Sequence, residues 1–184
     1  MRLFRYINIS RNVYKEIKKQ KQYNKTFLVP YLHELENKYG GTFPDEQKKK
    51  ILNYYGLFIT SFLCSNYTKL YGRTLTDAER KRATLFGILT PVGDDLFDVD
   101  KLDTERIHLI TYDPQNYTAT TFSANVAKEI QSFLLADVPH KEAYLLAAKN
   151  VLDIQIETAR QTNPAIAEQE LEYITYMKGA ASVI

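Results

Sequence analysis

The residues best suited to chemistry are aspartates, five of which fall within the ten positions 94–103. They follow directly after an apolar run, residues 83–89. If this segment is helical, Asp94 and Asp98 lie one turn apart on one face, with Asp95 beside them. Mg²⁺ prefers hard oxygen ligands and is often held by one or two carboxylates together with substrate phosphates. The spacing therefore predicts a metal site formed by Asp94, Asp95 and Asp98 that holds a phosphate-bearing substrate.

The same residues also have a purely structural interpretation. Residues 94–105 carry six acidic side chains and a single lysine, and their mutual repulsion is unfavourable unless water, cations or a basic partner offsets it. Pro91 and Gly93 predict that the helix kinks or restarts one turn before Asp94. After a restart, Asp94 and Asp95 become first-turn acids, which favour the positive end of the helix dipole. Both interpretations stay open from the spacing alone.

The chain that positions these aspartates is helical in pattern nearly throughout. Residues 11–38 carry apolar side chains at three- and four-residue steps, with Pro30 expected to kink or divide the segment. Gly40 ends it, because glycine tolerates the left-handed helix cap. A nearly all-apolar run, residues 51–63, predicts a central helix that is covered on several sides and ends near Gly72.

Later signals complete an all-helical architecture. Thr76 and Glu79 form a capping box that opens the helix carrying the aspartates. Further helices are expected over residues 103–110, 123–136, 139–163 and 164–178. Residues 117–122 are the best candidate for a strand, but they are short and isolated. We therefore expect one all-α bundle over residues 1–184. The apolar, uncapped residues 179–184 predict a chain that is cut in mid-helix.

Composition limits the classes of protein to be considered. The 184 residues are 45% hydrophobic and 25% charged, with a single cysteine, Cys64, which fits a small buried side chain. The lack of a disulfide framework and of a visible signal peptide leads us to expect a cytoplasmic protein. Residues 1–50 carry 12 Lys+Arg against 5 Asp+Glu, a charge of +7. A solvated helix face is the favoured explanation. Peripheral membrane contact through the basic N-terminal helix is the alternative, and no nucleic-acid motif accompanies the lysines.

The Asp-Asp-x-x-Asp pattern of Asp94, Asp95 and Asp98 resembles the first metal-binding motif of class I isoprenoid synthases. The resemblance implies the N-terminal two-thirds of that helical fold, around an apolar pocket. It also implies Mg²⁺, an allylic prenyl diphosphate as substrate, and ionisation of the diphosphate followed by condensation or cyclisation. Lys178, followed by small residues, resembles the lysine that contacts diphosphate in prenyltransferases. A surface lysine is the equally weighted alternative, and a homodimer is a further expectation.

The chain departs from that family in two respects. The second carboxylate motif, which follows the lysine in the family, is missing, and weak or no turnover is therefore expected. Asp153 and Glu157, at i and i+4, could replace the missing second motif. The favoured interpretation is that they belong to a solvated helix face beside Arg160. The arginine pair that follows the first motif in chain-elongating enzymes is also absent, which puts elongation in doubt.

Two other functions compete with this hypothesis. A helical nucleotide pyrophosphohydrolase also binds Mg²⁺ through helix-borne carboxylates, and an additional acidic cluster comprises Glu168, Glu170 and Glu172. A non-catalytic helical interaction domain is the other alternative. His33, His108 and His140 lack ligand spacing and are expected at the surface or at helix caps. No Gly-rich phosphate loop, zinc pattern or nucleophile elbow occurs in the sequence.

Overall fold

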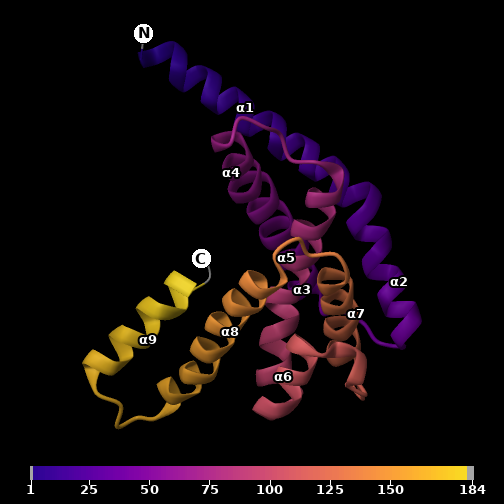
Figure 1. Ribbon diagram of the computed structural model, residues 1–184, viewed down its shortest axis with the longest axis vertical. Helices are drawn as coiled ribbons and strands as arrows, with labels where there is room; N and C mark the ends of the chain where they lie inside the picture. The colour runs from indigo at the N-terminus through magenta and orange to yellow at the C-terminus, as the bar shows by residue number, and fades with distance from the viewer. Residues whose placement is uncertain (1, 182–184) are drawn as a thin grey trace.

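The computed structural model describes the backbone of residues 2–181 and the side chains of residues 10–158, 160, 161, 163–177 and 179. Every regular element in this part of the chain is helical, which confirms the predicted all-α class (Figure 1). The elements are α1 (Arg2–Tyr23), the π-helix η1 (Asn24–Leu28), α2 (Val29–Tyr39), α3 (Asp45–Lys50), the π-helix η2 (Ile51–Cys64), α4 (Ser65–Leu70), α5 (Asp77–Asp98), α6 (Thr104–Tyr112), the 3₁₀ turn η3 (Pro114–Asn116), α7 (Phe122–Ala136), α8 (Lys141–Thr158), the 3₁₀ turn η4 (Ala159–Thr162) and α9 (Glu168–Ala181).

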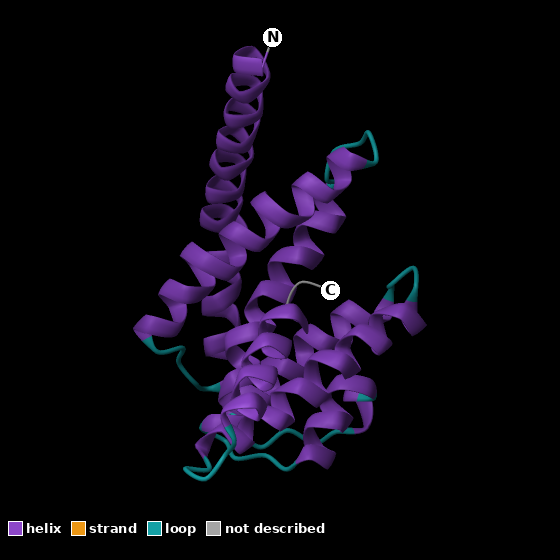
Figure 2. Ribbon diagram, turned by 90° about the vertical axis from the view of Figure 1, so that its left-hand side faces the viewer, coloured by secondary structure: helices purple, strands orange, loops and turns teal. Residues whose placement is uncertain are grey.

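Helix α5 is the centre of the packing. It lies between η2 and α7, and α1 packs on η2 (Figures 1 and 2). Its buried apolar side chains recur at three- and four-residue steps, the spacing of one helix face: Leu85, Ile88, Val92 and Leu96. Each such side chain stabilises the fold by about 1.5–3 kcal/mol when fully buried. Residues on α2 and α7 complete this core, among them Leu32, Leu35, Val126 and Ile130.

The start of α5 is as predicted, but its course is not. Thr76 accepts a hydrogen bond from the Glu79 backbone, and the Glu79 carboxylate accepts one in return from the Thr76 backbone. The predicted restart at Pro91 is wrong, because α5 continues unbroken through Asp98. The aspartates therefore lie at the C-terminal end of a helix, where a negative charge is unfavourable by about 0.3–1 kcal/mol each. The interpretation of Asp94 and Asp95 as favourable first-turn acids is excluded.

The central apolar helix differs from its prediction in which face it buries. Its buried residues are one isoleucine, Ile51, and three small residues, Gly56, Thr60 and Ser61. Its large aromatic side chains, in contrast, are exposed on the opposite face, and the expectation of cover on several sides is wrong. Small residues at the inner face of η2 allow the backbones of η2 and α5 to approach each other closely. A Cβ on Gly87 of α5 would lie 3.0 Å from the backbone carbonyl of Tyr55.

A buried polar network attaches α1 to η2 and α5. The Gln20 amide, fully buried, donates to the carbonyl of Gly56 at 2.8 Å and to the Thr84 hydroxyl at 3.0 Å. Asn24 donates to the carbonyl of Leu52 at 3.0 Å. These side chains therefore hydrogen-bond the backbone of the π-helix from outside it. Long π-helices are rare, and in η2 the hydrogen bonds from Gln20 and Asn24 satisfy backbone carbonyls of such a helix.

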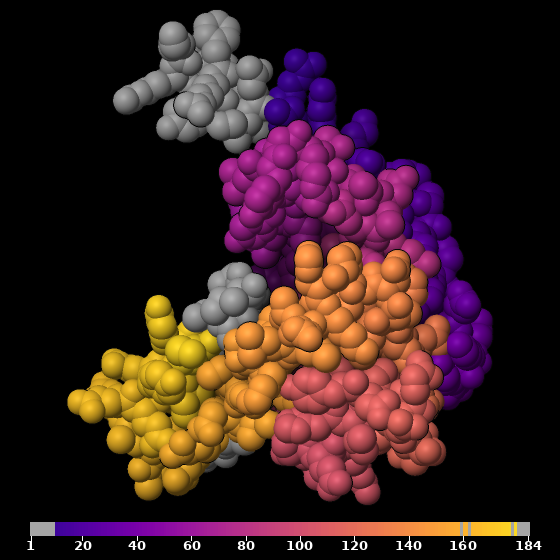
Figure 3. Space-filling model, in the orientation of Figure 1, coloured from indigo at the N-terminus to yellow at the C-terminus, as the bar shows by residue number. Residues whose placement is uncertain are grey.

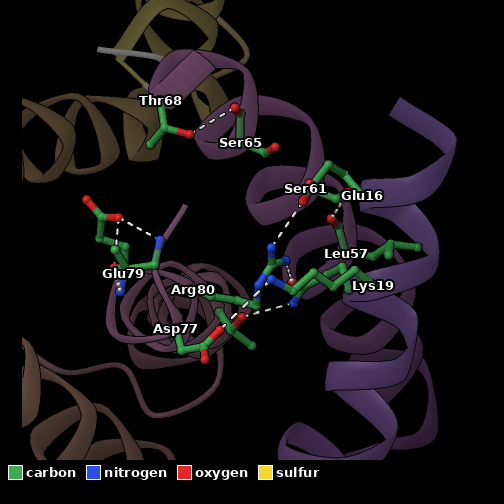
Figure 4. Close-up of polar contacts among 12 residues, drawn as sticks. Glu16, Lys19, Leu57, Ser61, Ser65, Thr68, Asp77, Glu79 and Arg80 are labelled. Atoms are coloured by element: carbon green, nitrogen blue, oxygen red, sulfur yellow. Dashed lines mark hydrogen bonds and ion pairs between the residues drawn. The ribbon is translucent and has the colours of Figure 1, made fainter. Parts of the chain in front are cut away.

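Arg80 is the charged member of this network. Only 1% of its surface is exposed, and it donates to Gln20 at 2.7 Å and to Glu16 at 3.0 Å. Figure 4 shows Arg80 on α5 directed toward Glu16 on α1, with Lys19 and Asp77 beside them. The buried guanidinium thus fixes the distance between the two helices, because removing either partner leaves a charge without compensation.

The remaining boundaries follow the sequence with small shifts. Gly40 and Gly72 end their helices with φ of 62° and 71°. Asp103 caps α6 through the backbone of Arg106, as expected. Thr121, rather than the predicted Ser123, caps α7. The last helix begins at Glu168 and not at residue 164. Residues 117–122 form no strand in the described chain, because no second strand is present to pair with them.

Candidate functional site

Asp94 lies between η2 and α8. Its carboxylate is half-buried and accepts a hydrogen bond from Gln155 of α8 at 3.4 Å. Burial raises the pKa of the Tyr55 hydroxyl on η2, and the negative charge of the Asp94 carboxylate raises it further. The carboxylate is therefore close enough to both helices to act on a group bound between them.

Asp95 points in a different direction, toward α3. Gln47, a buried side chain, donates to the Asp95 carboxylate at 2.6 Å and to the carbonyl of Pro91 at 3.3 Å. Burial, opposed by the Gln47 hydrogen bond, raises the pKa of Asp95. Asp98 is exposed, on the same face of α5 as Asp94 and one turn further along. Asp94 and Asp98 therefore share one face of α5, whereas Asp95 faces α3.

The last two aspartates of the segment have local structural contacts. The Asp100 carboxylate accepts a hydrogen bond from the Thr121 hydroxyl at 2.5 Å, and Asp103 caps α6. Among the described side chains, no group of three or more His, Cys, Asp or Glu is arranged to hold a metal ion. The sequence prediction of three converging ligands is therefore reduced to two carboxylates, which is the number that Mg²⁺ commonly uses beside substrate phosphates.

An aromatic column lies along η2. We use this name for Tyr54, Phe58 and Phe62, which are 57%, 44% and 40% exposed. The rings of Tyr54 and Phe58 are stacked with centroids 5.9 Å apart, and those of Phe58 and Phe62 follow at 4.9 Å. Tyr55, the residue whose pKa is raised by Asp94, packs edge-on against Tyr54 at 5.0 Å. The column thus leads away from the carboxylate along one face of the helix.

One side of the molecule is hollowed. In the space-filling view, the outline is indented between the magenta segment that contains α4 and the yellow segment of α9 (Figure 3). Phe86, two turns before Asp94, is 44% exposed, so the apolar surface above the aspartates is accessible. Large exposed apolar patches on a protein often mark binding sites for a ligand or a partner.

Most other residues singled out from the sequence have contacts of their own. Lys178 is within α9, but its side chain lies outside the described residues. Asp153 and Glu157 pair with Lys149 and Arg160, as expected for a solvated face. Glu170 also pairs with Arg160. Of the histidines, His33 pairs with Glu36, and His108 lines a shallow surface depression with Leu109 and Tyr112.

The sequence interpretation missed two contributors to the site. The aromatic column was treated as part of a covered helix, although its four-residue spacing was visible in the sequence. Gln47, which orients Asp95, carries no sequence signal, because its contact depends on how α3 crosses the end of α5.

The described helices include none that combines the length and apolar composition needed to cross a bilayer.

Comparison of the chain with protein-family models, with curated protein sequences and with solved structures found no match. The resemblance to class I isoprenoid synthases therefore rests on the aspartate motif and on the order of helices alone.

Proposed function

We propose that the protein binds an allylic prenyl diphosphate, with the diphosphate at Asp94 and Asp98 and the apolar tail along the aromatic column. The observation that carries this proposal is that the Asp94 carboxylate acts electrostatically on Tyr55, whose ring packs edge-on against Tyr54 at the start of the column. An anionic head and an apolar tail are the two parts of a prenyl diphosphate, and each has a complementary surface here once a cation is bound.

The position of the acids in α5 supports a role for them in binding cations. Asp94, Asp95 and Asp98 lie at the C-terminal end of the helix, where they oppose its dipole. Gln47 and Gln155 each donate one hydrogen bond to this group, and Asp98 is left exposed. A bound divalent cation offsets both the dipole and the mutual repulsion, whereas in its absence the arrangement costs stability.

Each residue has a distinct task in this proposal. Asp94 and Asp98 hold Mg²⁺, which when bound supplies positive charge against the diphosphate. Gln47 fixes Asp95 and so keeps its carboxylate directed away from Asp94. Tyr54, Phe58 and Phe62 pack against the tail, and their ring faces favour a positive charge on it through the aromatic quadrupole. Whether condensation or cyclisation follows depends on groups beyond these residues.

A ligand panel on the unmodified protein tests the proposal. We expect farnesyl diphosphate with Mg²⁺ to raise the melting temperature, because a ligand that binds only the folded state stabilises it. Farnesol, or farnesyl diphosphate with EDTA, should give little shift. A nucleoside triphosphate that produces the larger Mg²⁺-dependent shift would overturn the proposal in favour of a nucleotide pyrophosphohydrolase.

A non-catalytic interaction domain is the second candidate function. The observation that favours it is the accessible aromatic face of η2, which suits a partner helix as well as a prenyl tail. In that case the acids of α5 bind nothing. Replacing Asp94 and Asp98 with asparagine would then leave both the ligand-induced and the Mg²⁺-induced thermal shifts unchanged.

A further inference from the structure

The exposed apolar face of η2 continues onto α4. Beyond the aromatic column, the next outward-facing side chains are Tyr67, Leu70 and Tyr71, which are 56%, 80% and 82% exposed. The outward positions 54, 58, 62, 67 and 71 follow one another at four- or five-residue steps, so they form one stripe along the helix. Leu70 and Tyr71 end the stripe at the turn that leads to α5. We call Tyr67, Leu70 and Tyr71 the α4 tip.

Positive charge accompanies the α4 tip at the same end of the molecule. Arg11, Lys15 and Lys18 are exposed at i, i+4 and i+7 on α1, hence on one face. No described acidic side chain forms an ion pair with any of these three. The nearby Lys19 is 4.0 Å from Asp77, and Arg73 is paired with Glu79. The three α1 cations are therefore free to meet an anionic surface.

The arrangement of helices brings these two features together. In Figure 1, the turn after α4 and the N-terminal part of α1 lie toward the same end of the molecule, and α6 lies toward the other. The acidic residues around α6, including Asp98, Asp103 and Glu105, are thus remote from the α1 cations. The molecule has a basic end with exposed tyrosine and leucine, and an acidic end.

We infer that the basic end docks onto an anionic lipid bilayer. Tyrosine and leucine enter the boundary between headgroups and acyl chains, and lysine and arginine remain at the phosphate level. The α4 tip supplies the inserted groups and Arg11, Lys15 and Lys18 supply the charges. A prenyl tail in the bilayer then meets the stripe at Tyr71 and can follow it to Asp94, a path of roughly 20–25 Å along the helix. This route rests on the proposed function, whereas the docking does not.

Vesicle co-sedimentation with the full chain tests this inference. We expect binding to vesicles of phosphatidylcholine with phosphatidylserine, weaker binding to phosphatidylcholine alone, and loss of the difference at high salt. The double variant Leu70→Glu/Tyr71→Glu should weaken binding at least about tenfold. Lys15→Glu/Lys18→Glu should weaken it by about 25-fold or more, since each basic residue near the surface contributes about fivefold.

The matched control is Tyr173→Glu/Tyr176→Glu on α9, where the side chains are 59% and 73% exposed but lie away from the α4 tip. It should bind vesicles like the unmodified protein. Equal loss in the control and tip variants would overturn the inference, as would absence of vesicle binding by the unmodified protein. A concentration-dependent dimer that Leu70→Glu abolishes would also overturn it, because a second copy would then cover the tip. Vesicle binding requires neither Mg²⁺ nor diphosphate, so its failure is distinct from failure of the proposed function.

Discussion

Replacing Arg80 by methionine tests how α1 is held against α5, the central helix that carries the aspartates. Arg80 is 1% exposed and donates to Glu16, whose side chain is 20% exposed, and to Gln20, which is fully buried. Methionine fills much of the same volume but leaves the Glu16 carboxylate without its cation. Breaking a buried ion pair at one partner costs about 3–5 kcal/mol, and the Gln20 amide oxygen loses its hydrogen bond as well.

That loss is a large part of the stability of an ordinary domain, which totals about 5–15 kcal/mol. It corresponds to a fall of about 6–20 °C in melting temperature for a chain of this size. The assay is urea unfolding followed by far-ultraviolet circular dichroism, which reports the helices directly. The double variant Glu16→Gln/Arg80→Met should recover part of the loss, because no charge is then left unpaired.

Arg106→Met is the matched control. Its guanidinium pairs with Asp103, but the side chain is 59% exposed, and exposed pairs contribute about 0–1 kcal/mol. If Arg80→Met costs no more than Arg106→Met, or if adding Glu16→Gln makes it worse, the buried network does not hold α1 against α5 and the reasoning fails.

The remaining predictions concern α5. Gly87→Ala should destabilise the fold by about 1–3 kcal/mol, because the added Cβ lies 3.0 Å from the Tyr55 backbone. Gly93→Ala should stabilise it by up to about 1 kcal/mol, because no atom lies within 4 Å of the added Cβ. Urea unfolding of the two variants measures both changes. Because the folded-state pKa of Asp95 is raised above its unfolded value, the folded state binds more protons between those two values, and this group's contribution to stability falls as pH rises through that window. Asp95→Asn should therefore raise the melting temperature at neutral pH and remove this pH dependence, and a lower melting temperature at neutral pH would contradict it.

Much of the fold was predictable because local signals decide it. The capping box at Thr76, the glycine caps at Gly40 and Gly72 and the Asp103 cap are short-range chemistry, and each occurs as the sequence predicts. Pro91 misled the prediction, since a proline inside a helix removes one hydrogen bond but does not always break the helix when tertiary packing holds both sides.

The site was less predictable because it depends on how helices cross. The i, i+4 spacing of Asp94 and Asp98 was visible, but the diversion of Asp95 to Gln47 depends on the position of α3. Likewise, the apolar composition of η2 gave no indication that Gly56 and Thr60 would face the core and Phe58 would face outward. Burial of small residues beside exposed aromatic ones reverses the usual pattern, and only the tertiary structure reveals it.

The most direct test of the central claim compares two ligands on two variants by isothermal titration calorimetry with Mg²⁺. If the head and tail of one ligand bind the carboxylates and the column, Asp94→Asn/Asp98→Asn should weaken inorganic pyrophosphate and farnesyl diphosphate alike, by about tenfold or more. Phe58→Ala should weaken only farnesyl diphosphate, by about 5–30-fold. Asp153→Asn/Glu157→Gln, the equally spaced acids of α8, should change neither affinity. Affinities for farnesyl diphosphate that are unchanged in both the Asp94→Asn/Asp98→Asn and Phe58→Ala variants would contradict the account.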